Sequence, residues 1–393
     1  MKKKGRRRKP PLFHCYSGVR PEPGGTVGLK TSTQRQRLEQ LLDNPRCDKN
    51  AASAILNVSL HSLAEALAEE AKATGQEFAK VKPIAFPKFA FEIGNAFEAS
   101  LFEGEQPLLI ERILIEGGLI SPGSNPIFVA REENLTTHEY LESSHSLLKK
   151  INTTTSGRPR IINGFKLPAQ VLPPESTFEV DLLVAIPNED GSHRLVVGEV
   201  KVYPDRGGRT DVVQVSGARS QAGLYVHVLK NWLKTLDGVE KLDVDGTGFL
   251  VFAEPTKGIP KFAALENLSD QDRRAEVAID RITHIFESPN VQDLVANSDP
   301  DEKLSFVREQ ADEYRESCWG HCAMAEVCYR KAVAQDKTIV LGQKTEQQLS
   351  TLSLSQAVAL ADGEVLPNND VELDVVARFA DARYPELEGL KWK

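Results

Sequence analysis

Three ionisable residues lie on the two arms of an expected β-hairpin. The runs TFEVDLLVAI and RLVVGEVKVY have the composition of strands, and PNEDGSH between them has the composition of a turn. If the turn is centred near Asp190, Asp181 lies directly across from Glu199. Lys201 shares a strand face with Glu199, because side chains two residues apart on a strand point the same way. The hairpin therefore predicts two carboxylates and one ammonium in one place.

This trio has the chemistry of a divalent-metal site. Like charges directly opposite one another destabilise a sheet, so the two carboxylates require a compensating cation. Mg²⁺ or Mn²⁺ prefers oxygen ligands, polarises a phosphodiester and activates a bound water. Lys201 would orient that water or stabilise the charge that builds on phosphorus. We expect Asp181, Glu199 and Lys201 to catalyse phosphodiester hydrolysis; the alternative is a salt-bridged E-x-K face on an exposed strand.

A helix expected after the hairpin carries Gln221 and Tyr225 four residues apart, on one face. With FEVDLLV, VVGEVKV and QAGLY in this order, the sequence resembles the RecB-like branch of the PD-(D/E)XK nuclease superfamily. The resemblance implies that Gln221 and Tyr225 line the nucleic-acid path beside the metal. It also implies a further metal ligand from a helix ahead of the hairpin. There IGNAFEASLF offers Gly94 and, in place of the family's usual His, Glu98.

Four of the five cysteines form a second pattern. Cys318, Cys322 and Cys328 fall in a C-x3-C-x5-C array, and such clustering in a reducing compartment indicates metal before disulfide. Three thiolates are one short of the usual four, so we expect Cys47 to complete the set. The metal would then clasp the two ends of the core and stabilise the fold.

The spacing resembles that of the CRISPR-associated RecB-like nucleases and the AddB nuclease domain, with one cysteine before the core and three after it. That resemblance implies a [4Fe-4S] cluster, although C-x3-C replaces the family's usual C-x2-C. Zinc is the alternative, with His14 or His321 as substitute ligands. Cys15 is left over and is expected to be a free thiol.

Length and composition set the domain organisation. A chain of 393 residues with 40% hydrophobic residues is long enough to bury a sizeable core. We expect a basic flexible leader over residues 1–30, a nuclease domain over 31–335 and a helical appendage over 336–393, with residues 108–176 matching the family loosely. The resemblance implies an α/β class: a restriction-endonuclease-like α/β/α core with a central mixed sheet, plus helical N-terminal and C-terminal segments.

Hydrophobic periodicity and capping residues predict the individual elements. Strands are expected over 177–186, 194–203 and 247–255, and the stretch 107–176 is expected to be irregular apart from one helix. The expected helices span residues 31–43, 51–75, 89–102, 138–151, 212–234, 270–286, 301–315, 345–363 and 371–385.

Charge is unevenly distributed. The net charge is −8, and residues 2–9 carry seven positive charges, so the remainder carries about −15. This argues against broad coating of DNA but allows a local basic track on the phosphate backbone, for which Arg206, Arg209, Arg219 and Lys230 are candidates. No apolar run reaches the roughly 18–20 residues of a membrane span, and no secretory signal is recognisable, so we expect a cytoplasmic protein without membrane contact.

These patterns together predict a Mg²⁺- or Mn²⁺-dependent deoxyribonuclease. We expect it to act as an exonuclease on single strands or DNA ends, in DNA repair or in defence against foreign DNA. The alternatives are a catalytically inactive DNA-binding or scaffold subunit and an RNA-directed nuclease. The C-terminal helices are expected to offer a surface for a protein partner.

Overall fold

The computed structural model of the chain describes residues 34–73, 96–97, 100–101, 108–130, 132, 134–169, 172, 177–204, 210–254, 260–296, 299–349, 351–370, 372–373 and 377. The chain divides into two units, Met1–Lys30 and Thr31–Lys393. All the elements below belong to the second unit.

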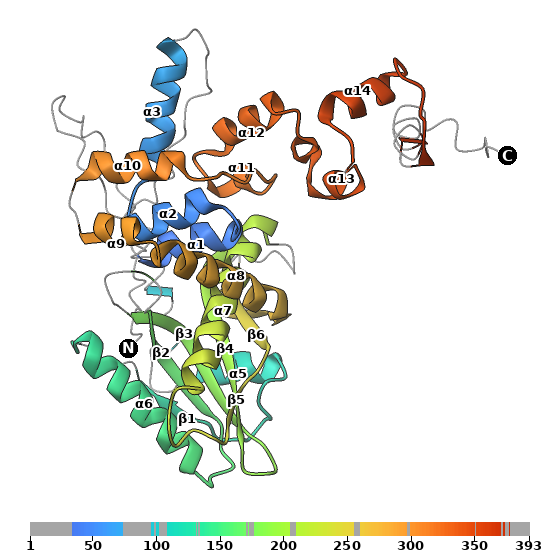
Figure 1. Cartoon of the computed structure of the whole chain (residues 1–393). Coiled ribbons are helices and arrows are strands. Elements are labelled where there is room, and N and C mark those ends of the chain that lie inside the picture. The colour runs from blue at the N-terminus through green and yellow to red at the C-terminus, as the bar shows by residue number, and fades with distance from the viewer. Residues whose placement is uncertain are drawn as a thin grey trace, which may run out of the picture. The chain divides into compact units, whose positions relative to one another are not determined.

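The described strands form one mixed, seven-stranded sheet (Figure 1). Its order is β1-β2-β3-β4-β6-β7, with β5 beside β4. The pairs β1–β2, β4–β5 and β4–β6 are parallel, and the others are antiparallel. The bounds are Ile127–Val129 (β1), Arg160–Pro168 (β2), Thr177–Pro187 (β3), His193–Pro204 (β4), Leu242–Val244 (β5), Thr247–Ala253 (β6) and Pro260–Asn267 (β7). The predicted α/β class with a mixed sheet is confirmed.

The central hairpin β3–β4 has the predicted register. Leu182 pairs with Gly198, and the ladder continues to the pair Pro187 and His193. The last pair away from the turn is Leu182 and Gly198, and the same register extended by one step places Asp181 opposite Glu199. In the turn, the Asn188 amide donates to the Ser192 carbonyl at 2.8 Å. The predicted hairpin and its register are therefore confirmed from the pair Leu182 and Gly198 to the turn.

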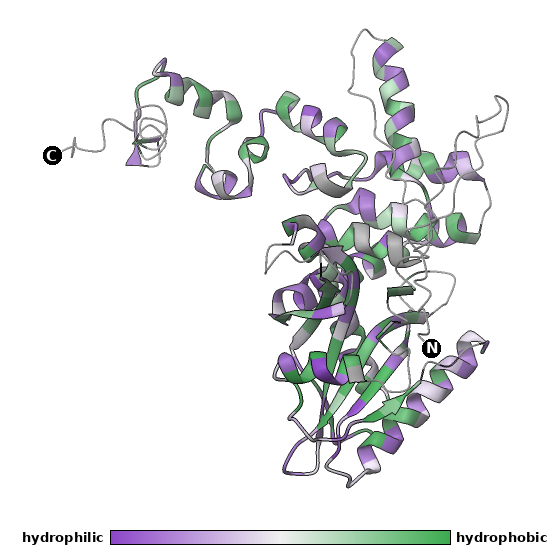
Figure 2. Ribbon diagram, turned by 180° about the vertical axis from the view of Figure 1, so that it is seen from behind, coloured by the Kyte–Doolittle hydropathy of each residue, from purple (hydrophilic) through white to green (hydrophobic). Residues whose placement is uncertain are grey.

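Helices cover both faces of the sheet. On one face lie α7 (Val212–Leu233) and α6 (Thr137–Thr153), with α8 (Ser269–Phe286) packed on α7. On the other face, α5 (Leu108–Glu116) buries Ile110, Ile113 and Leu114 in a cluster with strand residues. Alternation along β3 divides Leu182 and Leu183 between these two cores. Figure 2 shows hydrophobic residues concentrated along the strands.

The remaining helices come from the two ends of the described chain. Residues of α1, α2, α9, α10 and α12 join the core on the α7 side of the sheet. Their bounds are Gln34–Asp43 (α1), Asp48–Leu56 (α2), Leu60–Ala73 (α3), Pro289–Ala296 (α9), Pro300–Glu309 (α10), Cys318–His321 (α11), Ala325–Ala334 (α12), Thr338–Leu341 (η1), Gln343–Gln348 (α13) and Leu354–Asp362 (α14).

Two predicted helices are each divided in two. The helix expected over 51–75 is α2 and α3, whose axes differ by 117°, because Asn57 takes the left-handed conformation (φ 54°) that ends a helix. The helix expected over 345–363 is α13 and α14, because Ser353 and Gln356 form a capping box that begins a new helix. The helix expected over 301–315 is shorter and ends at Glu309.

The prediction that residues 107–176 are irregular apart from one helix is wrong in three places. It contains α5, β1 and β2, and β2 is the partner of β3. The elements α9, α11, α12, η1, β5 and β7 are likewise absent from the prediction; β5 has only three residues. Of the helix expected over 89–102, residues 96–97 are helical and most of the rest lies outside the described residues, as does most of 371–385.

Within the described part of the chain, no single helix is long and apolar enough to cross a membrane. The bent pair α2 and α3 reaches the required length and composition only when the two helices are taken together.

Replacing either of two glycines by alanine tests the packing, and the two changes are expected to shift the free energy of unfolding in opposite directions. A methyl group at Gly198 of β4 would lie 2.1 Å from the ring of the fully buried Phe249, so we expect Gly198→Ala to destabilise the fold by about 1–3 kcal/mol. Gly217, inside α7, has open space around it, and Gly217→Ala should stabilise by about 0.5–1 kcal/mol. Urea unfolding measures both changes; equal effects would contradict the packing of β4 against β6.

Candidate functional site

The structure brings together the three ionisable groups predicted from the hairpin. Asp181 is 7% exposed and Glu199 is fully buried. The Lys201 ammonium forms an ion pair with the Glu199 carboxylate and lies 4.0 Å from Oδ2 of Asp181. The same Oδ2 atom accepts a hydrogen bond of 2.9 Å from the backbone amide of Val200. We call Asp181, Glu199 and Lys201 the carboxylate centre.

The sheet is irregular around this centre. In β2, Gly164 lies opposite Asp181, between two regular pairs, and takes a positive φ of 65°. The β4–β6 ladder shifts its register between Val200 and Pro204, and the β6–β7 ladder shifts after Leu250. Such irregularities re-aim side chains and are common beside active sites. Pairing of β3 with β4 thus stops at Leu182 and Gly198, beside the carboxylates, and pairing of β2 with β3 is interrupted at Gly164.

Gln221 and Tyr225 lie on α7, the helix that covers β3 and β4. Both side chains are buried, and Nε2 of Gln221 donates to the Tyr225 hydroxyl at 2.7 Å. The Tyr225 ring packs at 6.3 Å from the ring of Phe178, at the start of β3. Tyr225 thus packs α7 against the hairpin, while its hydrogen bond with Gln221 lies within α7. The place of both residues on a nucleic-acid path stays a prediction.

Of the other predicted site residues, two are paired elsewhere in the structure and three lie outside the described residues. Glu98, Arg206 and Arg209 lie outside the described residues. Arg219 is ion-paired with Glu266 of β7 at 2.8 Å. Lys230 is ion-paired with Asp272 of α8 at 2.7 Å. The protein's own carboxylates therefore already bind two of the four basic residues considered for the DNA backbone.

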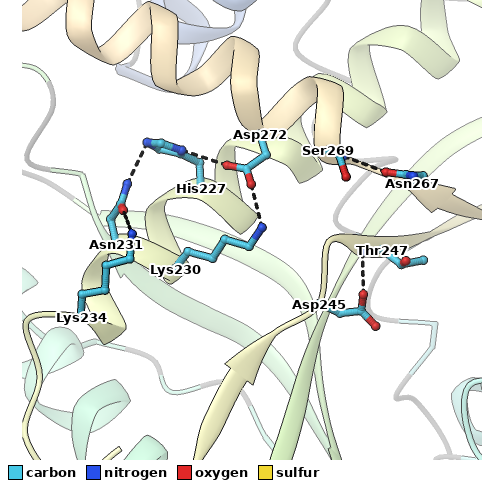
Figure 3. A network of polar contacts seen from close by, with 9 residues as sticks. All are labelled: His227, Lys230, Asn231, Lys234, Asp245, Thr247, Asn267, Ser269 and Asp272. Carbon is cyan, nitrogen blue, oxygen red and sulfur yellow. Dashed lines mark hydrogen bonds and ion pairs between the residues drawn. The ribbon is translucent and has the colours of Figure 1, made fainter. Parts of the chain in front are cut away.

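Asp272 is the centre of a polar network between α7 and α8 (Figure 3). Its two oxygens face Lys230 and Nδ1 of His227, the latter at 2.9 Å. The amide nitrogen of Asn231 lies 2.9 Å from Nε2 of His227, which therefore accepts, so Nδ1 carries the proton that is donated to Asp272. Burial raises the pKa of Asp272, but the hydrogen bonds from Lys230 and His227 outweigh it and hold the pKa below its ordinary value.

The four cysteines of the second pattern line a single small cavity. Cys47 precedes α2, Cys318 begins α11 and Cys328 lies on α12, and these three are buried while Cys322 is partly exposed. Main-chain contacts join the two ends of the described chain here. The Lys49 amide donates to the Ala311 carbonyl at 3.0 Å.

Burial raises the pKa of the Cys47, Cys318 and Cys328 thiols. Nearby backbone N–H groups, of Glu313 and Asn50 at Cys47 and of Arg315 at Cys318, act in the opposite direction. Among the described residues, no three Cys, His, Asp or Glu side chains are placed to hold one metal ion as they stand. Lining a cavity is a weaker condition than ligation, and four soft thiols around one space are the donor set of zinc or an iron–sulfur cluster.

Two residues at this cavity were not assigned a role from the sequence. Asn44 and Lys49 both line it and are both buried. Nδ2 of Asn44 lies 3.6 Å from Sγ of Cys318 and donates to the Glu313 carbonyl at 2.6 Å. In the sequence, Asn44 reads as a helix breaker before Pro45, and nothing near Lys49 indicates that it is buried.

Comparison of the chain with protein-family models, with curated proteins and with solved structures gave no match. The function is therefore inferred from the residues and their geometry.

The Asp272 network gives an acid-dependent contribution to stability. Because the folded-state pKa of Asp272 is lowered, its contribution is present above the unfolded value of 3.8 and is lost as the pH falls through the folded value. We expect Asp272→Asn to reduce stability by about 1–2 kcal/mol at pH 7. The difference from the parent protein should shrink below pH 4 in urea unfolding. Asp270→Asn, an exposed change in the same helical turn, is the control; an equal loss there would contradict the assignment.

Proposed function

We propose that this protein is a divalent-metal-dependent nuclease whose reaction takes place at the carboxylate centre. One observation carries the proposal: Asp181 and Glu199 face each other on the two central strands, buried, with the Lys201 ammonium against both. Structural surface ion pairs are solvent-exposed and contribute little to stability. Two buried carboxylates with a partly buried ammonium, at a break in the sheet, favour a site with a function.

The donor set fits a hard divalent cation. Two carboxylates and one ammonium leave a net charge of −1 in a buried place, and carboxylate oxygens are the ligands that Mg²⁺ and Mn²⁺ prefer. Asp181 and Glu199 would hold the ion, and Glu98 is the further ligand that the resemblance to RecB-like nucleases implies. When bound, the ion would polarise the phosphodiester and lower the pKa of a water molecule.

Lys201 would have two successive roles. Without metal, its ammonium is the cation that compensates the two carboxylates. With Asp181 and Glu199 holding a divalent ion, the Lys201 ammonium would no longer be needed to compensate them and could turn toward the substrate. Lys201 would then orient the attacking water or stabilise the negative charge on the phosphoryl oxygens. Exposure of 19% of its side chain gives the ammonium a route to a bound phosphate.

We propose DNA as the substrate, with single strands or ends preferred, and DNA repair or defence against foreign DNA as the setting. These finer statements rest on the resemblance of the FEVDLLV, VVGEVKV and QAGLY motifs to the RecB-like branch. The order of those motifs along the chain, and the pairing of β3 with β4, support the restriction-endonuclease-like core that the same family implies.

We also propose that Cys47, Cys318, Cys322 and Cys328 hold a [4Fe-4S] cluster, with zinc as the alternative. Their shared cavity supports the ligand set, and the resemblance supports the cluster. Such a centre would join α2 to the segment that carries α11 and α12, and so would contribute folding free energy rather than chemistry.

End-labelled single-stranded and double-stranded DNA, incubated with Mg²⁺ or Mn²⁺, tests the nuclease. We expect cleavage by the parent protein and a loss on the order of a hundredfold or more in Glu199→Gln and Lys201→Met, because each removes charge from the centre. Matched RNA substrates distinguish a deoxyribonuclease from an RNA-directed enzyme.

The matched control is Asp245→Asn, which weakens the partly buried ion pair of 2.8 Å with Arg194 near the turn end of β4. It should cleave as the parent protein does. Equal cleavage by all the variants, or DNA binding without cleavage by the parent protein, would contradict the proposal and favour an inactive DNA-binding or scaffold subunit.

Metal analysis of protein purified without oxygen tests the cysteine centre. We expect about four iron atoms per chain for the cluster, or about one zinc for the alternative. Cys47→Ser and Cys328→Ser should lose the metal and unfold at lower denaturant concentration, because each removes a thiolate ligand. Cys15→Ser should retain it. Metal content unchanged in Cys47→Ser would show that the two ends of the chain are not joined in this way.

A further inference from the structure

Lys49 is buried in a way that requires a negatively charged neighbour. Lys49 is only 4% exposed, and its Nζ atom donates to the carbonyls of Val307 and Arg308, at 3.1 and 2.5 Å. Among the residues that the structure describes, no carboxylate forms an ion pair with it. The nearby Asp312 instead pairs with Lys331 at 2.7 Å. A lysine is almost never fully buried unless it is paired, so two carbonyls are an incomplete environment for this ammonium.

The cavity that Lys49 lines would supply a further negative charge if its four cysteines held a metal centre. Four cysteine side chains lie around it, and a metal centre held by four thiolates carries net negative charge. Asn44 lines the same cavity, is 1% exposed and directs its side-chain amide toward Sγ of Cys318. One side chain thus brings a positive charge to the cavity and the other brings a hydrogen-bond donor to a sulfur atom.

We propose that Asn44 and Lys49 are positioning residues for the cysteine centre, and that they hold its negative charge and set its reduction potential. This inference rests on the proposed metal centre, and it is independent of the nuclease reaction. Neither residue is expected to bind the metal. Asn44 acts through the Cys318 sulfur, and Lys49 acts through its charge and by fixing the end of α10 against α2.

The sign of the effect on the potential follows from charge. Reduction of a cluster adds one electron, and therefore one negative charge, to a buried site. A neighbouring cation and N–H groups directed at sulfur stabilise the reduced form more than the oxidised form. Loss of either residue should therefore make the centre harder to reduce. It should also speed metal loss, since removal of such a supporting partner typically weakens metal binding by about 10–100-fold.

The test compares Lys49→Met and Asn44→Leu with the parent protein, each purified without oxygen and reconstituted with iron and sulfide. In a redox titration with dithionite, we expect both variants to have a lower midpoint reduction potential than the parent protein. We also expect them to lose iron to a chelator about tenfold faster. Lys49→Arg, which keeps the charge, should restore the potential of the parent protein. Lys331→Met removes a nearby charge that is 48% exposed and should change little.

The reduction potential distinguishes an effect of charge from an effect of packing. If the role of Lys49 were only structural, Lys49→Met and Lys49→Arg would both lose iron faster, and the reduction potential would not differ between them. An unchanged potential in Lys49→Met and Asn44→Leu would overturn the inference and leave the metal centre standing. A parent protein that takes up no metal would overturn both. If the centre binds zinc, the proposal predicts faster zinc release to a chelator from Lys49→Met than from Lys49→Arg, and equal rates would overturn it.

Discussion

Two buried carboxylates on the central hairpin place negative charge inside the sheet, and this charge has to be compensated. Asp181 and Glu199 occupy adjacent strands, and neither is exposed enough for water to screen its charge. In the described structure, the Lys201 ammonium and the Val200 amide compensate that charge. The surrounding ladder departs from regular pairing at the same place. A stability requirement alone would select apolar residues here, so the charges are best explained by a function that uses them.

The rest of the fold holds this centre in place. Helices on both faces exclude water from the hairpin, and the buried Tyr225 of α7 packs against Phe178 of β3. The packing of α8 on α7 adds the polar network around Asp272. At the ends of the described chain, the four cysteines and the main-chain contact between Lys49 and Ala311 join segments more than 250 residues apart. We therefore propose separate tasks for the two sites, chemistry at the carboxylates and stabilisation of the fold at the cysteines.

The sequence predicted the hairpin well because its information is local. Strand composition and the turn residues around Asp190 fix the register, and that register places Asp181 opposite Glu199. It predicted poorly where the structure depends on distant contacts. The strand β2 has Gly164 in its middle, which weakens a strand pattern, and it becomes a strand because β3 pairs with it. The burial of Lys49 is likewise set by α10, which is distant in the sequence.

A titration of the metal-free protein with Mn²⁺, followed by calorimetry, tests the central claim most directly. If Asp181 and Glu199 hold the ion and the Lys201 ammonium competes with it, the parent protein should bind Mn²⁺, Glu199→Gln should lose that binding, and Lys201→Met should bind more tightly. Binding that is unchanged in Glu199→Gln, or weaker in Lys201→Met, would show that the buried trio is a structural ion pair and would contradict the account.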